Sequence, residues 1–134
     1  MTTYKLFFAG LALVCTCAAQ TISPIACNLK AFQPQERAEW RKRLDQVMGS
    51  VSTVRDLSDG YSFKIDTRKA SFRDVAEWIE LERKCCPFFV FELGMQGEDG
   101  SIWLNLRGRE GVKQFIAADL HAVFDHLASQ PKRK

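Results

Sequence analysis

The sequence predicts a single α+β domain with the element order α-ββ-α-ββ-α. Two turn signals, Asp59-Gly60 and the run from Gly97 to Gly100, each separate two strand-like runs. Apolar residues at helical spacing fill the segments before, between and after these hairpins. We therefore expect a four-stranded, mostly antiparallel sheet with the helices packed on one face, all within residues 20–130.

Residues 1–19 have the layout of a secretory signal peptide. Lys5 precedes an apolar run from Leu6 to Val14, and small residues stand before Gln20. The run is short for a bilayer span, so we expect cleavage near Gln20, export to the periplasm or the medium, and no membrane span after processing. A lipoprotein is the alternative, because Cys15 and Cys17 lie near the end of the run.

The charge and composition of the chain do not indicate a nucleic-acid partner. Removal of Lys5 and of no acidic residue lowers the formal net charge from +3 to +2. The one basic cluster is the tail at residues 131–134, which we interpret as a solvated end rather than a binding face. The mature chain of about 115 residues is long enough for one domain with one core.

The first half of the domain has clear boundaries in the sequence. Residues 25–29 could add an edge strand, and Pro34 begins a helix that extends to Met48. Strands follow at residues 51–57 and 61–66. Ser71 and Asp74 resemble a capping box that opens a second helix, which Pro87 ends.

The second half repeats the pattern. Strands at residues 88–95 and 102–107 form a hairpin, and Gly111 precedes a third helix that extends from Val112 to about Leu127. The second helix is predicted to bury a stripe that contains Phe72 and Ile79. The predicted common core comprises Phe72, Ile79, Phe89, Phe91, Leu104, Leu106, Phe115, Ile116 and Val123.

Three cysteines remain after processing, and they carry most of the available chemistry. Cys85 and Cys86 are adjacent at a helix-to-strand corner, where a helical last turn would make their side chains diverge, and Cys27 lies far upstream. The three thiols could hold a soft ion such as Hg(II), Cu(I), Zn(II) or As(III). Alternatively, Cys27 could bridge Cys85 or Cys86, or the adjacent pair could be packing residues at the corner.

Catalysis has little support in the sequence. His121 and His126 are five residues apart on one helix, so their side chains diverge and predict ordinary surface histidines. Glu82 is expected to pair with helix neighbours rather than to act as a base. A thiol-redox protein ranks third, because no resolving motif or positioned base is visible.

One stretch also resembles a known family. The chain resembles a family of small uncharacterised bacterial proteins that have an E-x-x-C-C-x-F-F-x-F motif. The resemblance lies mainly in Glu82-Arg83-Lys84-Cys85-Cys86-Pro87-Phe88-Phe89-Val90-Phe91. It extends to two earlier runs, Cys27-Asn28-Leu29 and Trp40-Arg41-Lys42. Some segments of this family occur with heavy-metal-responsive regulators, so the resemblance implies an association with soft metals.

The sequence thus predicts an exported protein that binds a soft metal or metalloid ion through Cys27, Cys85 and Cys86. The alternative is a binding module without enzymatic activity, stapled by a disulfide from Cys27 to Cys85 or Cys86.

Overall fold

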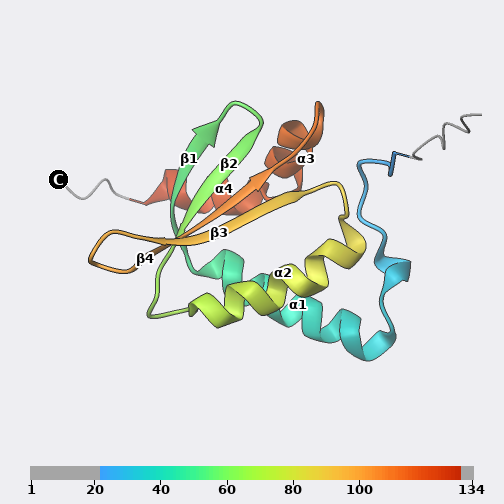
Figure 1. The fold of residues 1–134 in the computed structure, drawn as a ribbon, viewed down its shortest axis with the longest axis horizontal. Helices are drawn as coiled ribbons and strands as arrows, with labels where there is room; N and C mark the ends of the chain where they lie inside the picture. Colours follow the sequence, from blue (N-terminus) through green and yellow to red (C-terminus); the bar gives the residue numbers. More distant parts are fainter. Residues whose placement is uncertain (1–21, 131–134) are drawn as a thin grey trace, which may run out of the picture.

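The structure is a computed structural model that describes residues 22–130 (Figure 1). The predicted order is confirmed, with the third helix divided in two. The elements are the 3₁₀ helix η1 (Leu29–Ala31), α1 (Pro34–Gly49), β1 (Val51–Leu57), β2 (Gly60–Ile65), α2 (Phe72–Cys85), β3 (Val90–Gln96), β4 (Ser101–Arg107), α3 (Val112–Asp119) and α4 (His121–Ser129). The predicted leader (residues 1–19) and the basic tail (residues 131–134) both lie outside the described residues.

The four strands form one sheet in the order β1-β2-β4-β3, and all three neighbouring pairs are antiparallel. Each hairpin places its two strands side by side, and β2 and β4 join the hairpins at the centre. The helices α1 and α2 lie next to each other below the sheet as drawn in Figure 1. This confirms the predicted α+β architecture.

The helix boundaries follow from local chemistry. Pro34 occupies the first turn of α1, and the Gln33 and Glu36 side chains complete a capping box. Ser71 and Asp74 form the predicted box at the start of α2. Because Pro87 cannot continue a helix, α2 ends at Cys85, close to the site described below.

The core lies between the sheet and the helices, and the buried stripe of α2 overlaps the predicted one at Val75 but is shifted toward Trp78 and away from Phe72. The side chains of Val75, Trp78, Glu82 and Cys85 are buried, whereas Phe72 is 37% exposed. The Trp78 ring packs edge-on against the ring of Phe91 in β3, with 6.1 Å between the ring centroids. The Trp78 side of α2 therefore faces the sheet. Of the remaining predicted core, Leu104, Leu106 and Ile116 are buried, and Ile79, Phe89, Phe91, Phe115 and Val123 are partly buried.

The third predicted helix is interrupted at Leu120. Its backbone (φ −101°, ψ 21°) leaves helical geometry, so α3 ends at Asp119 and α4 begins at His121. The change of direction brings the Phe124 ring against Tyr61 of β2 with 4.9 Å between ring centroids. Packing against the sheet therefore overrides a spacing that would suit one continuous helix.

The edge strand predicted at residues 25–29 is wrong. The segment instead leads into η1, where the Asn28 side chain accepts a hydrogen bond from the backbone N–H of Lys30. The backbone N–H of Asn28 donates to the carbonyl of Cys85, at 2.9 Å. The end of α2, rather than a sheet edge, thus holds this segment.

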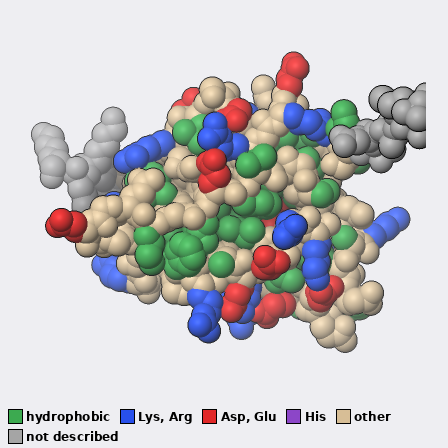
Figure 2. Space-filling view, in the orientation of Figure 1, with side chains coloured by type: hydrophobic (Ala, Val, Ile, Leu, Met, Phe, Trp, Pro, Cys, Tyr) green, Lys and Arg blue, Asp and Glu red, His purple; other side chains and the backbone are tan. Residues whose placement is uncertain are grey.

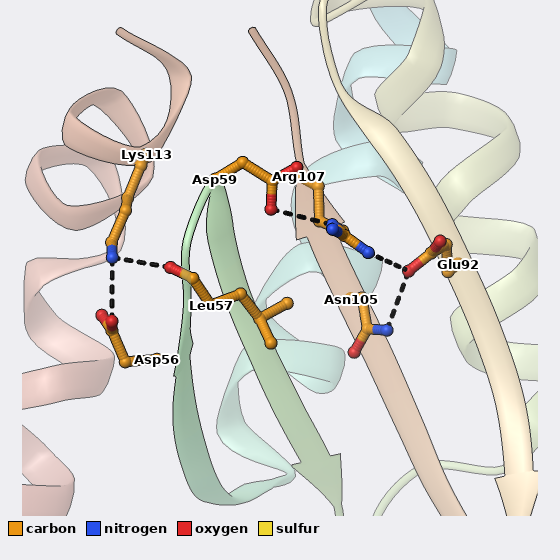
Figure 3. Close-up of polar contacts among 7 residues, drawn as sticks. All are labelled: Asp56, Leu57, Asp59, Glu92, Asn105, Arg107 and Lys113. Carbon is orange, nitrogen blue, oxygen red and sulfur yellow. Dashed lines mark hydrogen bonds and ion pairs between the residues drawn. The ribbon is translucent and has the colours of Figure 1, made fainter. Parts of the chain in front are cut away.

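Polar contacts lie on the face of the sheet that points away from the helices and at the ends of its strands (Figure 3). Arg107 donates to Asp59 and pairs with Glu92, and the Asn105 amide also donates to Glu92. Lys113 donates to Asp56 and to the carbonyl of Leu57, which ties α3 to the end of β1. Because these side chains are partly or fully exposed, each pair contributes little to stability.

Hydrophobic side chains gather in a band between the strands and α2 on the face drawn in Figure 2, with charged side chains below it. Val90 and Met95 of the edge strand β3 are among the exposed apolar residues. Within residues 22–130, no helix has both the length and the apolar character needed to cross a bilayer.

Candidate functional site

The three predicted cysteines meet at the C-terminal end of α2. Cys27, just before η1, and Cys86, just after α2, form a disulfide with 5.1 Å between their Cα atoms. Of the two bridges that the sequence left open, the structure contains the one to Cys86. The hydrogen bond from Asn28 to the carbonyl of Cys85 holds Cys27 beside the helix end.

Cys85 and Cys86 lie closer together than predicted. Their sulfur atoms are 3.5 Å apart and both side chains are fully buried. The expected divergence assumed a helical last turn, but the backbone of Cys86 has left helical geometry (φ −122°, ψ 65°). Cys85 keeps a free thiol, so one thiol and one disulfide share the same small volume.

A fourth potential ligand, Glu82, joins them. One ligand atom from each of Cys27, Glu82, Cys85 and Cys86 lies within 4.8 Å of all the others. Glu82 is only 4% exposed and accepts a 2.6 Å hydrogen bond from the indole N–H of Trp40. The sequence predicts that Glu82 pairs with helix neighbours, and this prediction is wrong because Glu82 is buried against Trp40 of α1. Its spacing of three residues from Cys85, which puts both on one helix face, was the available signal.

Burial controls the protonation of the site. Loss of hydration raises the pKa of Glu82 to about 7, although the hydrogen bond from Trp40 opposes the rise. Burial also raises the pKa of the Cys85 thiol to about 12, and the Glu82 charge adds to the effect. The negative end of the α2 dipole also disfavours a thiolate here, so Cys85 is a neutral thiol near pH 7 rather than an activated nucleophile.

A groove with a cavity volume of about 340 Å³ opens beside this cluster. Its walls come from η1, α1, α2, β4 and the junction of α3 with α4, and they include Cys27 and Glu82. The apolar wall comprises Leu29, Leu44, Met48, Leu120 and Val123, and the polar groups include Arg41, Asp45 and Asp119. The break at Leu120 that the sequence did not predict thus shapes one side of the groove.

The groove also contains an unpaired hydrogen-bond donor. Trp78 lines it and is 1% exposed, and its indole N–H has no partner within residues 22–130. A buried donor without an acceptor is costly in a folded protein.

The chain has no match among protein-family models, curated proteins or solved structures. The site must therefore be interpreted from its own geometry.

The other residues considered in the sequence lie apart from this cluster. His121 contacts the carbonyl of Ala118 through Nδ1, and His126 contacts the side chain of Gln130. Both histidines are exposed on α4, and neither belongs to the group of four ligand atoms.

Proposed function

We propose that the reduced form of this protein binds one thiophilic metal or metalloid ion through Cys27, Cys85 and Cys86. The observation that carries the proposal is the convergence of three sulfur atoms and the Glu82 carboxyl within 4.8 Å. Thiolate sulfur is the ligand that soft ions prefer. The resemblance of the double-cysteine stretch to proteins associated with heavy-metal regulators points the same way.

Charge balance narrows the choice of ion. The sulfur atoms of Cys85 and Cys86 are fully buried, where an uncompensated charge is expensive. Among the described residues, no lysine or arginine forms an ion pair with Glu82. As(III) with three thiolates is neutral, and so is Hg(II) with two thiolates while the third thiol keeps its proton. Two thiolates already leave Cu(I) negatively charged. Zn(II) normally takes four ligands, and three thiolates with the Glu82 carboxylate would leave it negatively charged as well, so we favour As(III) or Hg(II).

The disulfide makes this binding depend on redox state. Oxidation of Cys27 and Cys86 removes two of the three sulfur ligands, so a two-electron reductant such as a dithiol must open the bridge first. Export, which we propose from the leader-like layout of residues 1–19, would place the protein where the bridge persists. Protein isolated from its native host should then lack about 19 N-terminal residues.

A second candidate function follows from the bridge itself. Cys27 and Cys86 are separated by 59 residues, and closing a loop of that size stabilises a fold by roughly 4 kcal/mol on the chain-entropy model. The bridge also fixes Cys27 and the neighbouring Leu29 in the wall of the groove. In this role the protein is a stapled binding module, and Cys85 packs in the core.

Titration of reduced protein with arsenite and with Hg(II) separates the two functions. An ion site predicts one equivalent bound by the reduced protein and none by the oxidised protein. Cys27→Ser should weaken binding of either ion steeply, because it removes a ligand in the groove wall. Absence of binding to fully reduced, folded protein would overturn the ion site and leave the stapled module.

A further inference from the structure

We propose that the groove and the reduced Cys27–Cys86 pair together bind monoorgano arsenic(III) compounds, R–As(OH)₂, with the organic group R in the groove. This inference rests on the proposed function and specifies its substrate class. It begins from the size of the groove, because a bare ion does not need a cavity of about 340 Å³. That volume falls within the range of small-molecule sites, roughly 300–1,000 Å³.

The sulfur geometry fits such a compound. Arsenic in R–As(III) makes one bond to carbon, which leaves two bonds for sulfur. Cys27 and Cys86 lie near enough to form a disulfide, so after reduction they present two adjacent thiols. Cys27 also lines the groove, and an arsenic atom on this pair would stand at the end of the apolar wall.

The chemistry avoids burying charge. Each As–OH group condenses with one S–H group, so R–As(OH)₂ and two thiols give R–As(S–)₂ and two water molecules. No net proton is released and the product is neutral, which suits a pair in which the Cys86 side chain is buried and the Cys27 side chain is partly buried. The bridge is first opened by a dithiol, which supplies two electrons and two protons and leaves as a cyclic disulfide.

The walls select an apolar organic group. Trp40, Leu44 and Met48 of α1 offer apolar contact, and Leu120 and Val123 add to it from the junction of α3 with α4. Burying an aryl ring in such a groove is favourable at roughly 25 cal/mol per Å² of apolar surface.

The first test compares phenylarsonous acid with arsenite on the full chain, reduced with a phosphine because a dithiol would compete. Trp40 and Trp78 line the groove, so tryptophan fluorescence reports binding. In Cys85→Ser, arsenite affinity should fall at least tenfold because arsenite uses three sulfur atoms. Phenylarsonous acid affinity should change by less than threefold. An equal loss for both compounds would overturn the proposed division of the sulfur atoms.

The second test concerns the groove. Ala122 is exposed on α4 and lines the groove, whereas Ala118 is exposed on α3 and does not line it. Ala122→Phe should weaken phenylarsonous acid at least tenfold and leave arsenite unchanged, and the control Ala118→Phe should change neither. Equal affinities of Ala122→Phe and Ala118→Phe for the phenyl compound would overturn the groove assignment.

A third measurement needs no variant. The wild-type protein should prefer the phenyl over the methyl compound at least tenfold after each is normalised to its affinity for a small dithiol. No preference would contradict an organic group seated in the groove. Loss of arsenite binding with retention of the phenyl compound would overturn the proposed inorganic ion site alone, so the two failures are distinguishable.

Discussion

Replacement of Glu82 by glutamine tests the electrostatics of the site most sharply. Glu82 is 4% exposed, and its pKa is raised from 4.5 to about 7, chiefly by burial. The folded protein therefore holds this proton at pH values where the unfolded chain has released it. Because the folded state binds more protons, the free energy of unfolding must fall as pH rises from about 5 to about 8. Once the pH is above the pKa of Glu82 in the folded protein, the free energy of unfolding falls no further through this group.

The size of the effect follows from the two pKa values. At about 1.4 kcal/mol per pH unit, the interval between 4.5 and about 7 corresponds to a loss of about 3 kcal/mol. Most of that loss should occur between pH 5 and pH 8. Glutamine cannot ionise, yet its carbonyl oxygen can still accept the hydrogen bond from the Trp40 indole. Glu82→Gln should therefore lose most of the pH dependence and be the more stable protein at pH 8.

The assay is urea unfolding of oxidised protein at pH 5, 6, 7 and 8. Oxidised protein is used because Cys27 and Cys86 then do not titrate, and Cys85 keeps its proton in this range. Glu80→Gln is the matched control, because Glu80 lies on the same helix with an exposed side chain. The control should keep the slope of the wild type. A wild-type stability that is flat from pH 5 to 8, or an unchanged slope in Glu82→Gln, would refute the reasoning.

Three further predictions concern stability. Cys27→Ser should lower the stability of oxidised protein by about 2–4 kcal/mol, and a reductant should have a similar effect on wild type; no change in either would contradict a staple. Trp40→Phe should cost about 1–3 kcal/mol and move the pH midpoint of Glu82 upward, because it removes the donor that lowers the pKa; an unchanged midpoint in pH-dependent unfolding would argue against the contact. Ile116→Ala should cost about 2–5 kcal/mol through its cavity, whereas Phe72→Ala should cost far less; equal losses in denaturant melts would contradict the assigned faces of the helices.

Local signals account for the parts of the fold that the sequence predicts. The turn at Asp59-Gly60 and the capping box at Ser71 act over a few residues, so they determine where strands and helices begin. Gly60 is also required by tertiary contact, because a Cβ there would collide with the carbonyl of Leu106 on β4. This constraint involves two strands, β2 and β4, that are neighbours in the sheet but far apart in the sequence, so the turn motif alone does not reveal it.

The errors have a common cause in tertiary packing. Helical spacing places Phe72 in the predicted core stripe of α2, but the larger Trp78 determines which side of α2 faces the sheet. Leu120 interrupts a helix that spacing alone would continue, because α4 turns to pack against β1 and β2. In both places a contact between elements outweighs a periodic pattern.

The candidate site was predicted in its cysteines and missed in its carboxylate. Sequence identified Cys27, Cys85 and Cys86 because adjacent thiols at a helix end are chemically distinctive. Glu82 lies in a helix with many charged residues, so its charge alone does not distinguish it from them. Its burial in the site depends on a hydrogen bond from the indole of Trp40, which is 42 residues earlier. The groove is lined by residues of η1, α1, α2, β4, α3 and α4, so no local pattern could reveal it.

X-ray absorption at the arsenic edge, on reduced full-length protein loaded with one equivalent of arsenite, tests the central claim most directly. The account predicts three sulfur neighbours around arsenic in the wild type, and two sulfur neighbours with one oxygen in Cys85→Ser. A wild-type spectrum with only oxygen neighbours, or one that is unchanged by loss of the Cys85 sulfur, would contradict a three-thiolate site at the end of α2.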